Sequence, residues 1–254
     1  MPENPLISII TVVFNGVKTL EQTMQSVFNQ TYSNIEYIII DGGSTDGTLD
    51  IIEKYKHKIA YWVSEPDEGL YDAMNKGIKI ATGELIGIVN SDDWYESNTV
   101  ETVVENYHMF PHRKIFHGDM FIVDEANNKR LYKFNKSVFR FKYYGATYNH
   151  PTFFVTKDEY EAHKYNIKLK SVADIQFTLD AYLLNKEVFH YINRPLSNFR
   201  LGGVSGSLSQ YQALEEGFLA RKNAGMSLIQ NLFSIIVRLL YWGGAWIIQV
   251  LKLK

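Results

Sequence analysis

The sequence predicts an α/β fold in which a doubly wound, mostly parallel sheet is flanked by helices. Short apolar runs alternate with stretches that have the periodicity of an amphipathic helix, and this alternation is typical of β-α-β units. One apolar run, at residues 85–89, leads almost directly into Asp92 and Asp93. Open α/β sheets bind ligands at the carboxyl ends of their strands. The two observations together predict a sheet with a ligand site at one edge.

The first half of the chain shows this alternation most clearly. In its first predicted helix, Leu20, Met24 and Val27 recur at helical spacing and form one apolar face. Its last predicted helix ends at the turn of Thr82 and Gly83, because glycine readily ends a helix. The predicted strands cover residues 6–13, 35–40, 59–63 and 85–89, and the predicted helices cover residues 20–28, 48–55 and 70–81.

The pattern changes after Asp93, where short and partly antiparallel strands are predicted before one longer helix. These strands cover residues 114–124, 131–134 and 152–155, and the helix covers residues 172–184. No internal repeat or low-complexity linker divides the chain, so we expect one catalytic domain with a tail. The expected bounds are 1–205 for the domain, with a nucleotide-binding half at about 1–95 and an acceptor half at about 96–205, and 206–254 for a C-terminal helical segment.

Composition excludes several kinds of protein. A chain of 254 residues with 46% hydrophobic content can bury one large core. Its net charge of −2 gives no overall attraction to polyanions, so we expect no nucleic-acid partner. The absence of cysteine excludes disulfides, zinc–thiolate sites and thiol nucleophiles. No basic segment precedes the first apolar run, and we therefore expect a cytoplasmic protein.

The glycine motifs of two common nucleotide-binding classes are missing. No Gly-x-Gly-x-x-Gly follows the first strand and no Gly-x-x-x-x-Gly-Lys-Ser/Thr occurs, which argues against a dinucleotide dehydrogenase and a P-loop NTPase. Instead, acids stand at the ends of neighbouring strands, at Asp41, Asp67 and the pair Asp92-Asp93. Such acids suit a hydroxyl-rich, phosphate-bearing ligand with Mg²⁺ or Mn²⁺. Alternatively, Ser91 and Asp92 could cap a helix that starts at Trp94.

Six ordered motifs resemble the amino-terminal half of family 2 glycosyltransferases of the GT-A fold. They are Ser-Ile-Ile-Thr-Val-Val-Phe-Asn at 8–15, Ser-Val-Phe-Asn-Gln-Thr at 26–31, Asp-Gly-Gly-Ser-Thr-Asp-Gly-Thr at 41–48, Asn-Lys-Gly at 75–77, Ala-Thr-Gly at 81–83 and Ser-Asp-Asp at 91–93. The resemblance covers about residues 6–100 closely and extends more loosely to about 205. Within the family, the chain is most similar to enzymes that build bacterial exopolysaccharide and lipopolysaccharide.

The resemblance implies a set of site residues. The expected nucleotide-sugar contacts are Thr11, Val13, Asn15, Asp41, Asp67, Asn75, Asp92 and Arg200. Many members have a second acid after the one at position 41, where it contacts the base, whereas this chain has Gly42. The resemblance assigns the metal, Mn²⁺ or Mg²⁺, to Asp93 first and to Asp92 second. We expect Asp93 and the catalytic base, Asp174, to face each other across a single pocket.

Several of these residues have simpler interpretations. Asp174 lies in the first turn of a predicted helix, where an acid stabilises the helix dipole without any catalytic role. Asp180 is the second choice for the base. Arg200 belongs to a loop at 199–206 that could pair with a diphosphate and hinge at its glycines, or simply connect two elements. His150 could line the cleft or be a hydrogen-bonded structural histidine.

The predicted function is inverting transfer of a sugar from a nucleotide-sugar donor to a hydroxyl of a lipid-linked or growing saccharide in cell-surface polysaccharide synthesis. A UDP-sugar is the favoured donor, with GDP- and dTDP-sugars as alternatives. A sugar nucleotidyltransferase is a second hypothesis, although residues 14–18 make a poor version of its glycine-rich basic loop. A non-catalytic nucleotide-sugar or polysaccharide assembly module is a third.

Two segments bear on partners. Residues 129–145 contain six basic residues, no acid and interleaved aromatics, which suits anionic lipid but also single-stranded nucleic acid or a strand pair with one basic face. Residues 226–251 are largely apolar, but Arg238 leaves only 13 uncharged residues before Lys252, short of the roughly 20 that span a bilayer. With Trp242 and Trp246 they predict a helix or helical hairpin on the inner face of the plasma membrane. The alternative is packing against the domain or a partner subunit.

Overall fold

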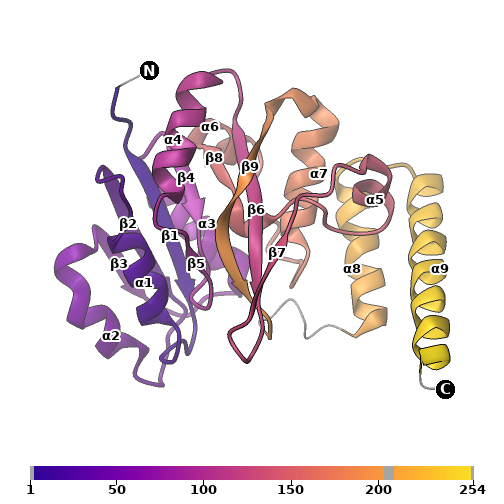
Figure 1. Cartoon of the computed structure of the whole chain (residues 1–254), viewed down its shortest axis with the longest axis horizontal. Helices are drawn as coiled ribbons and strands as arrows, with labels where there is room; N and C mark the ends of the chain where they lie inside the picture. Colours follow the sequence, from indigo (N-terminus) through magenta and orange to yellow (C-terminus); the bar gives the residue numbers. More distant parts are fainter. Residues whose placement is uncertain (1–2, 203–208, 253–254) are drawn as a thin grey trace.

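The computed structural model describes residues 3–202 and 209–252 of the chain (Figure 1). Its first half follows the predicted alternation closely, and the predicted bounds of α1 and α2 agree with the structure. The elements are β1 (Ile7–Val13), α1 (Leu20–Phe28), β2 (Ile35–Asp41), α2 (Thr48–Tyr55), η1 (Lys56–Lys58), β3 (Tyr61–Ser64), α3 (Leu70–Ile80) and β4 (Leu85–Ile88).

The second half contains shorter strands between helices. Its elements are β5 (Trp94–Tyr95), α4 (Thr99–Met109), β6 (Ile115–Val123), β7 (Lys129–Tyr132), α5 (Val138–Tyr143), η2 (His150–Thr152), β8 (Phe154–Thr156), α6 (Lys157–Ala162), α7 (Ala173–Asn185), η3 (Lys186–Val188) and β9 (Phe189–Arg200). One of the alternatives and one predicted strand start were wrong. Trp94 begins a strand, so Ser91 and Asp92 cap no helix there. The strand expected from residue 152 begins at Phe154, because residues 150–152 form a helical turn with Pro151 in its first positions.

A single sheet contains all nine described strands, in the order β3-β2-β1-β4-β8-β6-β9-β5, with β7 paired to β6. The pairs among β3, β2, β1 and β4 are parallel, and so is the pair of β6 and β9. Antiparallel pairs join β8 to β4 and β6, β5 to β9, and β7 to β6. The predicted α/β fold is confirmed, with the antiparallel pairing confined to the second half.

Two apolar cores lie on opposite faces of the sheet because the side chains of each strand alternate in direction. On β1, Ile10 and Val12 pack with α3 and α7, whereas Ile9 and Val13 pack with α1 and α4. At Gly77 of α3, an added Cβ would lie 2.5 Å from Cγ2 of Ile10. The missing side chain therefore lets α3 lie directly against the central strand.

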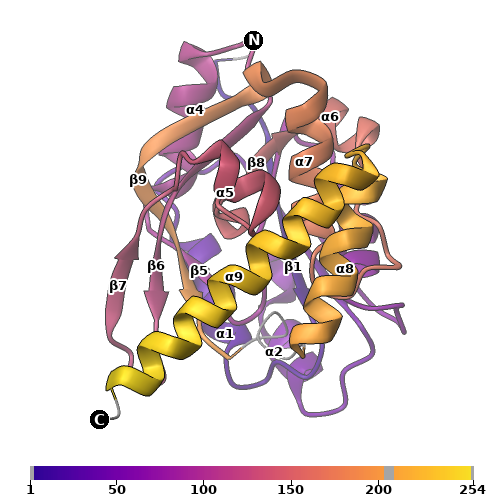
Figure 2. The same cartoon turned by 90° about the vertical axis from the view of Figure 1, so that its right-hand side faces the viewer.

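The C-terminal segment forms two helices, α8 (Gln210–Asn223) and α9 (Leu228–Lys252). Figure 2 shows α9 crossing one side of the molecule, where it contacts α5 and α8. No helix within 3–202 or 209–252 is long and apolar enough to cross a membrane. The predicted domain boundary at 205 and the glycines at 203 and 206 of the predicted hinge loop lie outside the described residues, as does the side chain of Trp246.

Candidate active site

A cleft of about 710 Å³ opens at the carboxyl ends of β1 and β4. This is the edge of the sheet where the sequence predicts a ligand site. Its walls come from the loop after β1, the loop before α3, the acidic loop after β4, the segment before α7 and the end of β9. Lining residues include Val13, Phe14, Asn15, Asp67, Glu68, Tyr71, Asn90, Asp92, Leu169 and Lys170.

Asp41 holds the turn after β2 in shape. Its carboxylate is fully buried and accepts hydrogen bonds from the backbone N–H groups of Gly43 and Ser44 and from the hydroxyls of Ser44 and Ser64, at 2.5–3.0 Å. Ser44 Oγ in turn accepts from Asn15 N at 2.7 Å. Asp41 therefore does not line the cleft, and it positions the loop that contains Asn15.

Asp67 covers the glycine that follows Asp41. A Cβ added at Gly42 would lie 2.6 Å from Oδ2 of Asp67, so the carboxylate occupies the space that a side chain at 42 would need. Oδ1 of Asp67 accepts from Gly69 N at 2.8 Å. Asp67 thus lines the cleft with a carboxylate next to Gly42, whereas the turn that contains Asp41 and Gly42 contributes no carboxylate to the cleft wall.

The adjacent acids of the β4 loop have different surroundings. Asp92 is partly exposed and lines the cleft, whereas Asp93 is 1% exposed. Oδ1 of Asp93 accepts from Arg200 N at 2.9 Å, but its Oδ2, like Oδ1 of Asn90, is buried without a hydrogen-bond partner. Burial raises the pKa of both acids, and the neighbouring charge of Asp92 raises the pKa of Asp93 further.

These two acids fit a divalent cation that shares its coordination with a ligand. Such ions are commonly held by one or two carboxylates together with substrate phosphates. Asp92 faces the cleft, and the unpartnered oxygen of Asp93 lies in the same loop. In the described parts of the chain, no group of three His, Cys, Asp or Glu residues could hold an ion unaided. The remaining ligands would come from a bound diphosphate and water.

Arg200 closes the loop of the two acids from the end of β9. Its Nε donates to Asp92 O at 3.2 Å, its Nη2 donates to Gln22 Oε1 at 2.7 Å, and its guanidinium lies over the ring of Trp94 at 5.0 Å. These contacts fix the position of the side chain beside the acidic loop. Arg200 is not among the residues that line the cleft.

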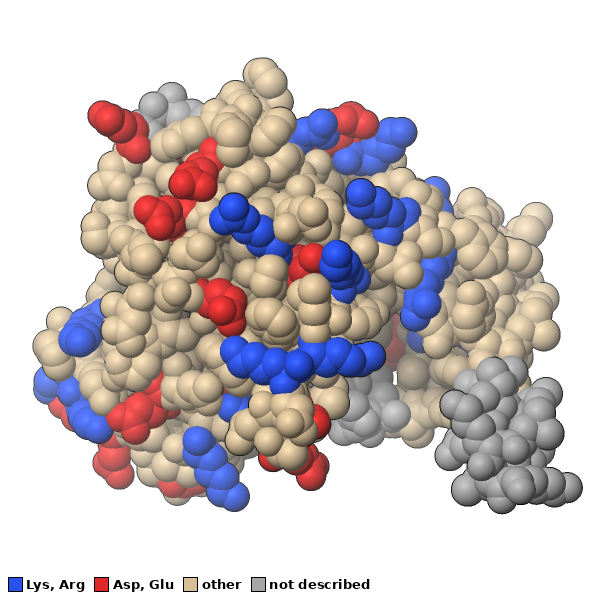
Figure 3. All heavy atoms as spheres, viewed as in Figure 1, with Lys and Arg blue, Asp and Glu red and all other residues tan. Residues whose placement is uncertain are grey.

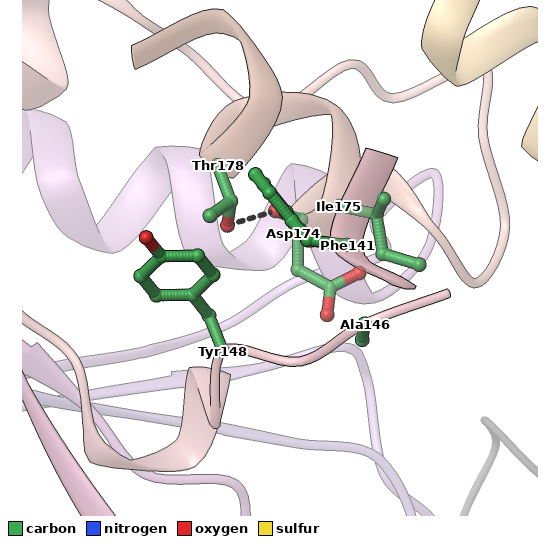
Figure 4. A pocket seen from close by; sticks show the side chains of 6 residues that line it. All are labelled: Phe141, Ala146, Tyr148, Asp174, Ile175 and Thr178. Atoms are coloured by element: carbon green, nitrogen blue, oxygen red, sulfur yellow. Dashed lines mark hydrogen bonds between the residues drawn. The ribbon is translucent and has the colours of Figure 1, made fainter. Parts of the chain in front are cut away.

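Asp174 lies beside the cleft and not in it. It lines a second, small pocket with Phe141, Tyr148 and Thr178, and this pocket has no room for a water molecule (Figure 4). The link to the cleft is Tyr71, which lines the cleft and donates its hydroxyl to Asp174 Oδ1 at 3.1 Å. Burial, and then the charge of Asp174, raise the pKa of Tyr71 well above its usual range. Tyr71 therefore remains a neutral donor.

A network of aromatic side chains supports Tyr71. Its ring stacks on Tyr165 at 5.6 Å, and the Tyr165 hydroxyl is hydrogen-bonded to His150 Nε2 at 2.7 Å and to the Tyr160 hydroxyl at 3.2 Å. The side chain of Asn75 makes two bonds to the backbone of Tyr165, at 2.8 and 3.1 Å. His150 and Asn75 are thus used in hydrogen bonds within the fold, as the simpler interpretation of His150 proposed.

The structure brings four of the predicted residues to the cleft wall: Val13, Asn15, Asp67 and Asp92. Six others are not among the lining residues: Thr11, Asp41, Asn75, Asp93, Arg200 and Asp174. Thr11 is fully buried, and its hydroxyl is hydrogen-bonded to Tyr37 at 2.9 Å. The expected single pocket between Asp93 and Asp174 is replaced by a cleft with Asp92 on one wall and Tyr71 on another.

Sequence reasoning missed Phe14, Tyr71 and Lys170. Phe14 is 65% exposed directly after the buried strand β1, and an aromatic at the tip of a buried strand was a usable signal. Tyr71 follows Leu70 at the start of a helix and reads as part of its apolar face. Lys170 comes from the second half, and no local pattern predicted that this segment meets the first half.

Residues 8–163 match the family described as Glycosyl transferase family 2. This match spans more than half of the chain, including the cleft loops of the first half and both acids of the β4 loop. The chain belongs to glycosyl transferase family 2.

The relatives agree with this membership. An uncharacterized glycosyltransferase of Mycobacterium tuberculosis is 43% identical over 101 residues, a match that spans 39% of this chain and only 38% of the relative. A PGL/p-HBAD biosynthesis glycosyltransferase of Mycobacterium bovis is 26% identical over 92% of this chain and 90% of its own length. The structure of S. aureus TarS 1-349 in complex with UDP-GlcNAc is 20% identical and has a TM-score of 0.70, covering 92% of this chain and 71% of TarS 1-349. This structural likeness confirms the GT-A fold.

Proposed function

We propose that this chain transfers a sugar from a nucleotide-sugar donor to a hydroxyl of a lipid-linked or growing saccharide, with inversion at the anomeric carbon. The main support is the cleft at the strand ends, which has Asn15, Asp67 and Asp92 in its walls and Tyr71 leading to Asp174. Membership in glycosyl transferase family 2 favours this activity over a nucleotidyltransferase.

For the donor, a UDP-sugar is the first choice. The cleft is lined by five separate segments, with an exposed aromatic, Phe14, and an acid, Asp67, on its walls. An aromatic face and a carboxylate suit a base and its N–H groups. The TarS complex with UDP-GlcNAc supports the same choice by fold, and GDP- and dTDP-sugars are the alternatives.

For the cation, we propose Asp92 as the first protein ligand and the free oxygen of Asp93 as the second, which reverses the order expected from the sequence. Asp92 faces the cleft, whereas one carboxylate oxygen of Asp93 already accepts a hydrogen bond from Arg200 N. A bound Mg²⁺ or Mn²⁺ would offset the negative charge that develops on the departing diphosphate. Arg200 keeps the acidic loop in place through its backbone and side-chain contacts.

For the acceptor, we propose that Asp174 takes the proton of the attacking hydroxyl. Tyr71 holds one carboxylate oxygen of Asp174, which leaves the other for the acceptor. A positioned base typically contributes about a hundred- to ten-thousand-fold in rate. Attack from the side opposite the leaving diphosphate inverts the anomeric configuration. Because the Asp174 pocket is closed to water, the acceptor must open it on binding.

The test is donor turnover by Asp174→Asn and by Asp180→Asn as a matched control. We expect Asp174→Asn to reduce kcat at least about a hundredfold while nucleotide-sugar binding, followed by thermal shift, stays unchanged. Asp180 lies six residues further along α7 and accepts a hydrogen bond on Oδ2 from Gln176 at 3.4 Å, and its variant should keep most activity. Full activity of Asp174→Asn would refute the assignment of Asp174 as the catalytic base. If the wild-type protein turned over no nucleotide sugar, the proposed enzyme class would be wrong.

We also propose peripheral contact with the inner face of the plasma membrane through α9. Eight apolar side chains on this helix are 44–80% exposed: Leu228, Ile229, Leu232, Phe233, Ile236, Leu239, Leu240 and Tyr241. This surface continues onto α5, where Phe139 is 48% exposed and its ring lies 6.2 Å from that of Phe233. An apolar helix face with basic neighbours is typical of interfacial binding.

Basic side chains lie on the neighbouring face of the molecule, to one side of α9. The segment 129–145 forms β7 and α5, and Figure 3 shows Lys and Arg side chains on the face over β6 and β7 and towards α5. In vesicle co-sedimentation, the double variant Ile229→Glu/Ile236→Glu should lose binding. Leu184→Glu, which changes a 77% exposed leucine on α7, should not. Equal sedimentation of both variants would contradict the membrane contact.

A further inference from the structure

Two arginines meet between the C-terminal helices without any carboxylate to balance them. Arg221 of α8 is 1% exposed, and Arg238 of α9 is partly buried. A Cβ added at Gly217 would lie 2.2 Å from Nη1 of Arg238 and 3.1 Å from Nη1 of Arg221, so both guanidinium groups converge on this glycine. Across residues 3–202 and 209–252, no acid forms an ion pair with either arginine.

Within the described residues, both arginines donate their hydrogen bonds to backbone carbonyls. Arg221 donates from Nε to Lys142 O at 2.6 Å and from Nη1 to Gly217 O at 2.9 Å, and Arg238 donates from Nη1 to Ala213 O at 2.9 Å. Nη2 of Arg221 is buried and has no partner. Burial, and then the charge of Arg238, lower the pKa of Arg221 to about 10. Two like charges, one buried and one partly buried, together with a buried free donor are costly unless an anion joins them.

We propose that Arg221 and Arg238 bind the phosphate of a membrane lipid, an inference that rests on the membrane contact proposed for α9. Guanidinium groups bind phosphate oxygens through paired, charge-assisted hydrogen bonds. Arg238 is the entrance because its side chain remains partly exposed, while Arg221 lies behind it.

The surroundings select an amphiphilic ligand and not a free anion. Tyr241, three residues after Arg238 and therefore on the same face of α9, is 48% exposed. On the other side, α5 contributes Arg140, whose guanidinium lies over the ring of Tyr144 at 5.0 Å. Tyr144 itself packs on Tyr241 at 4.4 Å. A phosphate at the arginine pair would therefore have the rings of Tyr241 and Tyr144 beside it, where acyl or polyprenyl chains can lie.

The test measures binding of the full chain to vesicles of phosphatidylcholine with and without phosphatidylglycerol. We expect Arg238→Gln to weaken binding to the phosphatidylglycerol vesicles about tenfold. Lys58→Gln removes the same charge from the exposed end of η1, away from α9, and should change the affinity less than about twofold. Arg238→Lys keeps the charge without the forked donor geometry and should give an intermediate affinity.

Equal affinities for Arg238→Gln and Lys58→Gln would overturn the proposal and assign the pair to helix packing alone. If inorganic pyrophosphate raises the Tm of the wild type but not of Arg238→Gln, while both bind vesicles equally, the pair binds soluble phosphate and the lipid assignment is wrong. Loss of vesicle binding by Ile229→Glu/Ile236→Glu, but not by Arg238→Gln, would leave the membrane contact standing and refute the phosphate site only. Nucleotide-sugar binding by each variant is measured in parallel by thermal shift. A variant that loses vesicle binding but still binds the nucleotide sugar reports on the lipid site alone, and not on the proposed transferase activity.

Discussion

The hydrogen bond from Tyr71 to Asp174 joins the donor cleft to the proposed base, and Tyr71→Phe removes it while keeping the aromatic ring. A hydrogen bond to a charged group contributes about 1.5–3 kcal/mol. The distance of 3.1 Å exceeds the usual length of a hydroxyl–carboxylate bond, so the lower end of that range applies. About 1.5 kcal/mol corresponds to about a tenfold decrease in kcat. Because the ring still stacks on Tyr165 at 5.6 Å, we expect the KM for the donor to change little.

The assay is steady-state release of the nucleoside diphosphate at saturating acceptor, with kcat and donor KM measured separately. Tyr165→Phe is the matched control, since its hydroxyl bonds to His150 and Tyr160 and not to Asp174. It should keep kcat within about threefold. A wild-type kcat for Tyr71→Phe would refute the role of this hydrogen bond. An effect confined to KM would show that Tyr71 acts through donor binding instead.

Four further predictions test the site and the fold. Asp92→Asn should abolish most metal-dependent transfer and remove the shift in Tm that Mn²⁺ adds in the presence of nucleoside diphosphate, whereas an unchanged shift would exclude Asp92 as a ligand. Gly42→Asp should weaken donor binding, measured by titration calorimetry, because the new side chain meets the Asp67 carboxylate at 2.6 Å; unaltered affinity would show that Asp67 can move aside. Gly77→Ala should lower the free energy of unfolding by about 1–3 kcal/mol in urea titrations, since its Cβ would meet Ile10 at 2.5 Å. Burial lowers the pKa of His117 from 6.5 to about 3, so between pH 7 and pH 5 the unfolded chain takes up a proton that the folded chain excludes. The free energy of unfolding should therefore fall by about 2 kcal/mol between pH 7 and pH 5. In His117→Gln, the free energy of unfolding should depend less on pH over this range.

Much of the first half of the fold was predictable because its signals are local. The bounds predicted for α1 and α2 match the structure, since the apolar spacing of Leu20, Met24 and Val27 already specifies which helix face is buried. In the second half, β5 has two residues and β8 has three, too few for a periodic pattern, and the helix of η2 replaced part of a predicted strand.

The sequence by itself determined the fold class, the family and the edge of the sheet at which the acids gather, because motif order and strand ends are properties of neighbouring residues. Only the tertiary structure decided which acid faces the cleft. Asp93 turns inward to Arg200 N, 107 residues away, and Tyr71 meets Asp174 from 103 residues away. Similarly, Asp67 covers Gly42, and Arg221 meets Arg238 over Gly217. The direction of each of these side chains depends on packing between distant elements, which no local pattern contains.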